Sequence, residues 1–344
     1  MWPNNHPDQP ILITGGTGFV GSHLVEALLA QGQTNLHVTT YRAIDEYTAH
    51  LLPSDHIHPV DLTDQSASAE LIKQIKPQQI YHLAAFATVG KSFDNTYQTL
   101  QNNLLLQYSV LEAVKQHAPQ TRILIIGSGM EYDFMQLAAG QQTAATENSP
   151  IGPVSPYAIS KVLQDLLGLS YYYSYQLQTI RVRPFNHIGE RQSPDFAIPS
   201  FAKQIVAIER GQQTELKVGN LEAIRDFTDV KDVVTAYILL MNQGKVGEVY
   251  NVGSGHGYPM TEVLKLLCSL AKQEIKIEAD PDWIRPLDIS VAVADISKIK
   301  TLGWQPTIEL RATLQRILDY WRQQWKKRLW PAWPVKMVRI WPNF

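Results

Sequence analysis

The sequence predicts an α/β fold: a Rossmann-type doubly wound parallel sheet joined to a smaller, irregular C-terminal substrate-binding domain. Three observations predict it. From Pro10 onward, short apolar runs alternate with longer segments of helical period, a pattern typical of a parallel sheet covered by helices. The first apolar run leads straight into a glycine-rich turn. Beyond about Pro184 the alternation becomes irregular, and turns containing Gly and Pro separate the helical segments.

The predicted elements follow in the order strand, helix, strand. Apolar runs predict strands at residues 11–14, 36–40, 57–59, 80–83, 122–128 and 178–183. Helical periodicity predicts helices at residues 19–31, 65–75, 96–117 and 155–175, and later near 200–210, 230–241 and 260–271. No internal repeat is visible, which argues against a solenoid or a propeller.

Composition narrows the class of protein. The chain has 344 residues, 44% of them hydrophobic, which is enough to form a full core. Its 30 basic and 32 acidic residues leave a net charge of -2, so the overall charge does not favour a nucleic-acid partner. Cys268 is the only cysteine, which excludes an internal disulfide and a cysteine zinc site, and we expect no metal. The N-terminus has no signal-peptide pattern, and no apolar run is long enough to span a membrane. We therefore expect a cytoplasmic protein.

The glycine-rich turn predicts a dinucleotide site. The strand ILIT runs into GGTGFVG and then into a helix, which places Gly15, Gly18 and Gly21 in the turn. Gly15 permits the tight turn, Gly18 lets the backbone approach a pyrophosphate at the helix N-terminus, and Gly21 allows the helix to pack closely on the strand. A purely conformational glycine turn is the competing interpretation.

Residues after the second and third strands bear on the choice of cofactor. The second strand ends in Thr40, Tyr41 and Arg42, without the acid that commonly reads the ribose of NAD. Because a guanidinium group suits a ribose phosphate, NADP is favoured and NAD remains possible. Asp61 and Leu62, after the third strand, are expected to meet the adenine, although Asp61 is equally typical of a strand-end turn.

The segment YAISK predicts the reacting groups. Tyr157 and Lys161 are four residues apart on a predicted helix that starts near Pro156, so they share one face. A neighbouring ammonium favours the phenolate of a tyrosine and brings its proton transfer into a useful range. Ser128, at the end of the fifth predicted strand, is placed to steady a substrate carbonyl.

Five segments together resemble the extended short-chain dehydrogenases/reductases that modify nucleotide sugars: GGTGFVG, LAAF, GSGMEY, YAISK and RPFNHIG. The resemblance runs from about Ile11 to Tyr320 and implies a homodimer formed through the two long helices, 96–117 and 155–175. It implies that Ser128, Tyr157 and Lys161 are catalytic. The cofactor-binding residues that it implies are Gly15, Thr17, Gly18, Phe19, Val20, Arg42, Asp61, Leu62, Leu83, Ala84, Ala85, Tyr157, Lys161 and Pro184. The substrate-binding residues that it implies are Asn186, Arg225 and Arg285, the arginines on the diphosphate.

The same resemblance gives a domain division. Residues 1–184 are expected to form the dinucleotide-binding domain, with segments near 226–254 returning to it. Residues 185–325 would mainly bind the nucleotide-sugar substrate, and residues 326–344 would form a basic tail rich in tryptophan. Trp321 and Trp325 are expected to contact the core, while a dimer edge and a membrane surface both stay open for the tail beyond Lys327.

Within the family, segments 192–205 and 219–230 are similar to GDP-6-deoxy-mannose reductases, which reduce GDP-4-keto-6-deoxymannose to GDP-rhamnose. In the related GDP-mannose 4,6-dehydratases, a carboxylate stands two positions after the catalytic Ser or Thr, where this chain has Met130. A thioether cannot accept the proton, but the adjacent Glu131 keeps the dehydratase or epimerase alternative open. Asp133 stands where the family usually has a glycine after the tyrosine of this segment, so the local loop is expected to differ in shape. A non-catalytic dinucleotide-binding sensor is the second alternative.

Overall fold

The computed structural model describes residues 7–41, 46–280 and 289–326. A seven-stranded sheet forms its centre, with strand order β10-β6-β5-β4-β1-β2-β3 and parallel pairing throughout. The strands are β1 (Ile11–Thr14), β2 (Leu36–Thr40), β3 (Ile57–Pro59), β4 (Gln79–His82), β5 (Arg122–Ile126), β6 (Gln178–Pro184) and β10 (Val249–Val252). The strand order reverses between β1 and β4, and such switch points are where open α/β sheets bind ligands.

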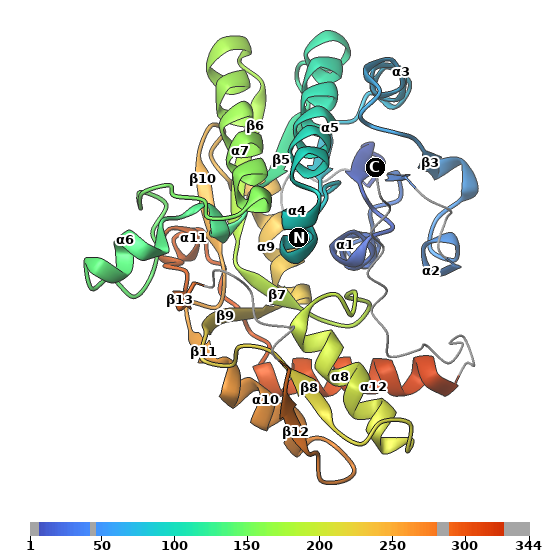
Figure 1. Cartoon of the computed structure of the whole chain (residues 1–344). Helices are drawn as coiled ribbons and strands as arrows, with labels where there is room; N and C mark the ends of the chain where they lie inside the picture. Colours follow the sequence, from blue (N-terminus) through green and yellow to red (C-terminus); the bar gives the residue numbers. More distant parts are fainter. Residues whose placement is uncertain (1–6, 42–45, 281–288, 327–344) are drawn as a thin grey trace, which may run out of the picture.

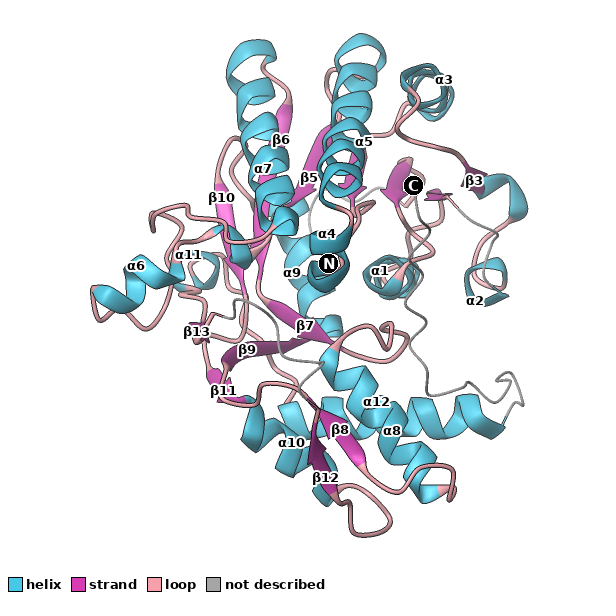
Figure 2. Ribbon diagram, viewed as in Figure 1, coloured by secondary structure: helices cyan, strands magenta, loops and turns pink. Residues whose placement is uncertain are grey.

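Helices cover both faces of this sheet (Figures 1 and 2). The helices α3 (Gln65–Ile75), α5 (Thr96–His117) and α7 (Pro156–Tyr175) lie side by side on one face. On the other face α1 (Phe19–Ala30) packs against α9 (Val230–Gln243). Successive side chains of a strand point to opposite faces of the sheet. In β1, Leu12 packs in the core under α3, α5 and α7, while Ile11 and Ile13 pack in the core under α1 and α9.

A second, smaller unit lies below the sheet in Figure 1. Its strands are β7 (Asn186–Ile188), β8 (Leu216–Val218), β9 (Ile224–Asp229), β11 (Gly257–Pro259), β12 (Ile277–Ala279) and β13 (Val291–Ala292). The helices α8 (Ala197–Glu209), α10 (Met260–Ser269) and α12 (Leu310–Lys326) enclose a separate core that contains Trp321 and is flanked by Trp325, as expected. Shorter helices are α2 (Glu46–Ala49), η1 (Ser54–His56), α4 (Val89–Asp94), η2 (Gly129–Glu131), α6 (Phe134–Ala139) and α11 (Ser297–Lys300).

The predicted elements of the first half are confirmed within one or two residues, with one difference that matters for the site. The fifth strand was expected to reach Ser128, but β5 ends at Ile126. Ser128 is instead the N-cap of η2, because its hydroxyl accepts a hydrogen bond from the Met130 N–H. The domain boundary at residue 184 stays a prediction. The prediction for the tail concerns residues outside the described part of the chain, except for Lys326.

Candidate active site

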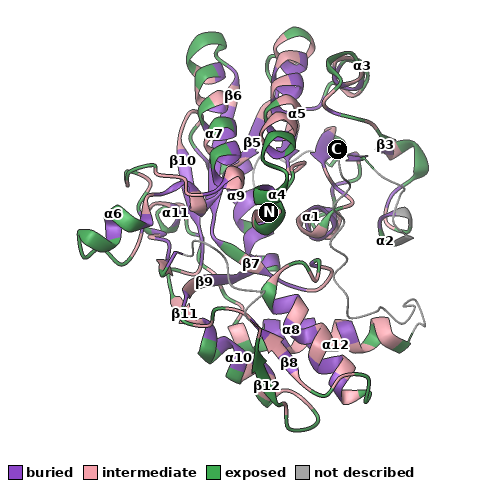
Figure 3. Ribbon diagram, viewed as in Figure 1, coloured by how far each residue is buried: buried purple, intermediate pink, exposed green. Residues whose placement is uncertain are grey.

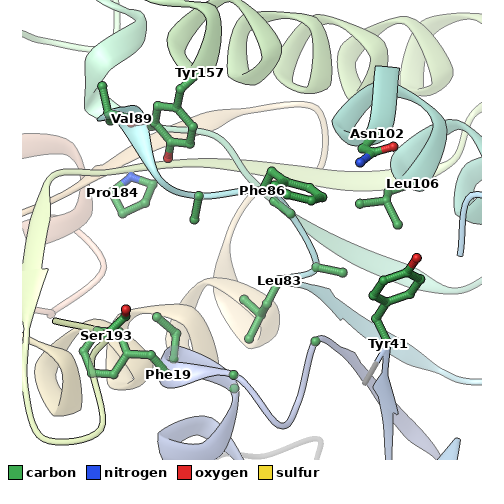
Figure 4. A pocket seen from close by; sticks show the side chains of 18 of the residues that line it. Phe19, Tyr41, Leu83, Phe86, Val89, Asn102, Leu106, Tyr157, Pro184 and Ser193 are labelled. Carbon is green, nitrogen blue, oxygen red and sulfur yellow. The ribbon is translucent and has the colours of Figure 1, made fainter. Parts of the chain in front are cut away.

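A cavity of about 1070 Å³ opens at the switch point of the sheet (Figure 4). A volume of this size exceeds what a drug-sized ligand needs and leaves room for a dinucleotide. Most of the residues predicted from the sequence line it: Gly15, Thr17, Gly18, Phe19, Val20, Asp61, Leu62, Leu83, Ala84, Ala85, Ser128, Tyr157, Pro184 and Asn186. Lys161 and Arg225 are not among the lining residues, and Arg42 and Arg285 lie outside the described residues.

The glycine turn has the geometry that a pyrophosphate needs. Gly15 has φ of +66°, a left-handed conformation that favours glycine, and a β-carbon there would lie 3.1 Å from the Ala84 backbone. A β-carbon on Gly21 would lie 2.4 Å from the Gly15 carbonyl oxygen, so α1 packs directly on the turn. Gly18 caps α1 without any side-chain hydrogen bond, which leaves the N–H groups of the first turn facing the cavity. These features fit the dinucleotide predicted from the sequence.

Tyr41 stands at the far end of the cavity, across from Asn102 and Leu106 of α5 (Figure 4). Asp61 lines the same end, and its Oδ1 accepts hydrogen bonds from the N–H and hydroxyl groups of Thr63. Both interpretations of Asp61, cavity residue and strand-end turn acid, therefore hold in the structure. The expected role in adenine binding stays a prediction.

Ser128, Tyr157 and Lys161 come together beside the cavity. The hydroxyl groups of Ser128 and Tyr157 share a hydrogen bond, and the Tyr157 hydroxyl points into the cavity (Figure 4). Lys161 lies behind this pair: its ammonium nitrogen is 6.0 Å from the centre of the Tyr157 ring. It donates hydrogen bonds to the Ile126 carbonyl and to Oε1 of Gln164, both at 2.9 Å.

The electrostatics of this group differ from the expectation in one respect. Burial raises the pKa of Tyr157 to about 12, and the hydrogen bond from Ser128 only partly opposes this. The expected lowering of the Tyr157 pKa by Lys161 was therefore wrong for this state, because burial dominates and the ammonium is turned toward Ile126 and Gln164. Burial lowers the pKa of Lys161 to about 8, while the charge of Glu131 acts to raise it. Tyr157 is thus held protonated, ready to donate.

A polar network between α5 and α7 fixes Lys161. The Gln164 amide, almost fully buried, donates to the Asn103 carbonyl at 3.0 Å while its oxygen accepts from Lys161. Asn103 in turn hydrogen-bonds the backbone of Phe86, which lines the cavity. Asn103 and Gln164 could not be predicted from the sequence, because amide side chains inside helices have no distinctive spacing.

Met130 lines the cavity and Glu131 does not. The Glu131 side chain is fully buried and turns away from the cavity, where its Oε2 accepts a hydrogen bond of 3.0 Å from Nε of Arg183. A shift of Glu131 into the site, which the sequence left open, is therefore not what the structure shows. The pattern Ser-x-x-Glu at 128–131 is the sequence signal of a capping box and pointed to this inward orientation.

One wall of the cavity is formed by Asn186 of β7 and by the segment before α8. Asn186 is exposed, and His187, Gln192, Ser193 and Phe196 line the wall beside it. The His187 ring, on β7, stacks on Phe19 at 6.0 Å and its Nδ1 is 3.0 Å from the Phe185 carbonyl oxygen, so this side chain is packed in place. Arg225 lies half-buried on β9, where it donates to the Ile224 carbonyl, and its role at the diphosphate stays a prediction.

Comparison with known proteins shows the family of this chain. The family model described as GDP-mannose 4,6 dehydratase matches residues 12–317. A GDP-6-deoxy-D-mannose reductase of Pseudomonas aeruginosa is 34% identical over 92% of this chain and 98% of its own length. GDP-mannose 4,6 dehydratase 2 of Arabidopsis thaliana is 30% identical over 91% of this chain and 87% of its length.

Solved structures give the same result. A structure of RMD from Pseudomonas aeruginosa complexed with NADPH superposes with a TM-score of 0.79 at 32% identity, covering 92% of this chain and 99% of that one. A Thermus thermophilus UDP-glucose 4-epimerase in complex with NAD superposes with a TM-score of 0.80 at 27% identity, covering 91% of this chain and 99% of that one.

The parallel sheet, the glycine turn and the Ser-Tyr-Lys group define an extended short-chain dehydrogenase/reductase of the nucleotide-sugar branch. Within that class, the chain belongs to the GDP-mannose 4,6 dehydratase family. Among the described residues, no helix is long and apolar enough to cross a bilayer, and no three His, Cys, Asp or Glu side chains are grouped as metal ligands.

Proposed function

We propose that this protein reduces the 4-keto group of a nucleotide-activated 6-deoxy sugar with NADPH, and that the substrate is GDP-4-keto-6-deoxymannose, which becomes GDP-rhamnose. The observation that carries the proposal is the hydrogen-bonded pair Ser128 and Tyr157 in the wall of a dinucleotide-sized cavity. The similarity to a GDP-6-deoxy-D-mannose reductase supports this choice of reaction.

The residues of the chain divide the chemistry among them. The bound dinucleotide supplies the hydride. When the dinucleotide is bound, the N-terminus of α1 and the glycine turn would hold its pyrophosphate, and Lys161 would hold the nicotinamide ribose. Tyr157 donates its proton to the carbonyl oxygen of the sugar, while the Ser128 hydroxyl orients that oxygen by a hydrogen bond. The Lys161 ammonium then stabilises the phenolate that Tyr157 becomes.

Reduction fits the cavity better than dehydration does. A dehydratase must remove a proton from carbon beside the transient ketone, which requires a base near Ser128. Met130 lines that part of the cavity, and the nearest carboxyl group in sequence, Glu131, is turned inward. Delivering a hydride to the ketone and protonating its oxygen require only the Ser128, Tyr157 and Lys161 group.

NADPH is the favoured cofactor and NADH the alternative. The similar structure of RMD is complexed with NADPH, whereas the epimerase contains NAD. In this chain Thr40 ends β2 and Tyr41 follows it, so no carboxylate stands there. An acid at that position would bind the free ribose of NAD and repel the extra phosphate of NADP.

Incubation of the protein with NADPH and GDP-4-keto-6-deoxymannose tests this function. The absorbance of the reduced nicotinamide should fall in proportion to the GDP-rhamnose formed, and GDP-mannose alone should give no reaction. Release of water from GDP-mannose would instead favour a dehydratase. Tight binding of NADPH without turnover of any 4-keto sugar nucleotide would favour a sensor.

We further propose a cytoplasmic homodimer that buries the outer faces of α5 and α7. Exposed apolar residues form a stripe along α7 at helical spacing: Ile159, Leu163, Leu166 and Tyr173. Tyr97 and Leu104 of α5 are exposed at the same spacing, and α5 packs directly against α7 (Figure 3). Such a two-helix apolar surface suits a second copy, because two copies would bury it symmetrically.

Sedimentation velocity tests the dimer. Leu166→Glu places a charge in the middle of the stripe and should convert the dimer to monomers without loss of NADPH binding. Met135→Glu, at an equally exposed apolar residue of α6, is the matched control and should leave the dimer intact. A wild-type protein that sediments as a monomer at all concentrations would refute this part of the proposal.

A further inference from the structure

Glu131 is a fully buried carboxyl group that the reaction above does not use. It ends η2, directly behind Ser128, and its side chain faces away from the cavity. Burying a carboxyl group is costly unless its oxygens are well bonded, and replacing a buried ion pair by apolar residues is often neutral or stabilising. A stabilising role alone is therefore a weak explanation for Glu131.

Both oxygens of Glu131 are engaged. Oε1 accepts a hydrogen bond of 2.7 Å from the backbone N–H of Ser128, and Oε2 accepts one of 3.0 Å from Nε of Arg183. The carboxyl group fills the space above Gly127, where an added β-carbon would lie 2.3 Å from Oε1. The backbone that carries the reactive serine is thus held directly by this carboxyl group.

Charged groups surround Glu131 on two other elements. On β6, Arg183 donates to Asp165 as well, at 2.6 Å, and Arg181 donates to the same Asp165 oxygen at 3.0 Å. On α7 lie Asp165 and Lys161, one helical turn apart. Burial and the charge of Asp165 raise the pKa of Glu131, while Arg183 opposes the rise.

The charge of Glu131 reaches the reacting groups. It raises the pKa of Lys161 and that of Tyr157, so both side chains keep their protons to higher pH while Glu131 is ionised. His82 on β4 also faces Lys161, but burial and the Lys161 charge lower its pKa to about 3, so it stays neutral at working pH. Tyr132, beside Arg183, has a raised pKa of about 12 and is neutral too.

We propose that Glu131 is a positioning residue of the reduction: its carboxyl group fixes the Ser128 backbone and sets the charge felt by Lys161 and Tyr157. It acts through these residues and does not touch the substrate. This inference rests on the proposed function, because the positions of Ser128 and Tyr157 matter only if they handle the substrate carbonyl. It also gives a role to a carboxyl group that lies beside the serine of a site that needs no carboxylate base.

Glu131→Gln tests the inference, because the amide oxygen still accepts from Ser128 while the negative charge is lost, together with the hydrogen bond from Arg183. The turnover number and KM are measured against pH with NADPH and GDP-4-keto-6-deoxymannose. Without the charge, Lys161 and Tyr157 release their protons more easily, so the alkaline fall of kcat should move down by about one pH unit. NADPH affinity below that pH should change less than about threefold, since the introduced amide keeps the backbone in place.

Two further variants make the result decisive. Glu131→Gln combined with Arg183→Met also removes the Arg183 N–H group that would face the new amide, so it tests the lost Glu131 charge without that contact, and the alkaline fall should shift in the same direction. Asp165→Asn removes a negative charge from the same network at a residue that contacts the arginines and not Ser128. Because the loss of that charge lowers the pKa of Glu131, Glu131 stays ionised and the alkaline fall should not move down.

An active wild type whose alkaline fall is unchanged in both variants that carry Glu131→Gln refutes the positioning role and leaves the proposed function standing. An equal shift in Asp165→Asn refutes it as well, because any loss of charge in the network would then have the same effect. A wild type that turns over no 4-keto sugar nucleotide refutes the proposed function itself, and the inference falls with it.

Discussion

Replacing Tyr157 by phenylalanine removes one hydroxyl group from the wall of the cavity and leaves the ring. The hydroxyl is the proton donor of the proposed reaction and the hydrogen-bond partner of Ser128. General acid catalysis by a positioned side chain contributes about 10²- to 10⁴-fold to the rate, or about 3–5 kcal/mol in the barrier. We therefore expect kcat to fall by that factor.

The structure indicates that little else changes. Ser128 keeps its hydrogen bond from the Met130 N–H, so its hydroxyl stays oriented. The lost hydrogen bond is worth about 1 kcal/mol, which is far too little to unfold the protein. Lys161 keeps both of its hydrogen bonds, so NADPH affinity should stay within about threefold of the wild type.

The assay follows the absorbance of reduced nicotinamide under saturating NADPH and keto sugar, with cofactor binding measured separately by fluorescence. Tyr175→Phe is the matched control, since Tyr175 lies on the same helix, outside the proposed dimer stripe, with 50% of its surface exposed, and should leave the rate unchanged. A Tyr157→Phe protein that binds NADPH normally and turns over within tenfold of the wild type would refute the reasoning.

Three other perturbations have definite outcomes. Gly21→Ala puts a methyl group 2.4 Å from the Gly15 carbonyl, so we expect NADPH affinity to fall at least about tenfold by titration, whereas Gly90→Ala, which meets nothing within 4 Å, should have no effect. Asp232→Ala leaves two backbone N–H groups and a threonine hydroxyl without their acceptor, and urea unfolding should show a loss of about 2–4 kcal/mol. Burial lowers the pKa of Lys161 to about 8 in the folded protein, whereas a lysine in the unfolded chain has a pKa of about 10.4. Between these two pH values the unfolded chain binds one proton more than the folded protein. Stability should therefore rise with pH across this window, by at most about 3 kcal/mol, and Lys161→Met should abolish the rise in urea unfolding; a rise of equal size in the variant would contradict it.

Local patterns predicted the part of the fold that local interactions determine. The helix limits at Thr96–His117 and Gln65–Ile75 follow from periodicity and, at Asp64, from a side-chain cap that accepts two backbone N–H groups. The short strands of the second unit, such as β8 and β12, were not predicted. Strands of three residues show no alternation to read, and they form because distant segments pair.

In the candidate site too, local motifs predicted some residues, and those joined only by long-range packing were missed. Ser128 and Tyr157 were predicted because their segments carry recognisable motifs, and the structure brings them into contact. The buried supports of Lys161, namely Gln164 and Asn103, lie on two helices 61 residues apart in sequence and are joined only by the packing of α5 on α7. The raised pKa of Tyr157 likewise depends on burial, which one motif cannot reveal.

Transfer of deuterium is the most direct measurement of the central claim. NADPH that carries deuterium at its transferable position is incubated with the protein and GDP-4-keto-6-deoxymannose, and the product is analysed by mass spectrometry and NMR. The proposed reaction predicts GDP-rhamnose with one deuterium on carbon 4 of the sugar. An unlabelled product, or conversion of GDP-mannose with no net use of NADPH, would contradict the proposed function.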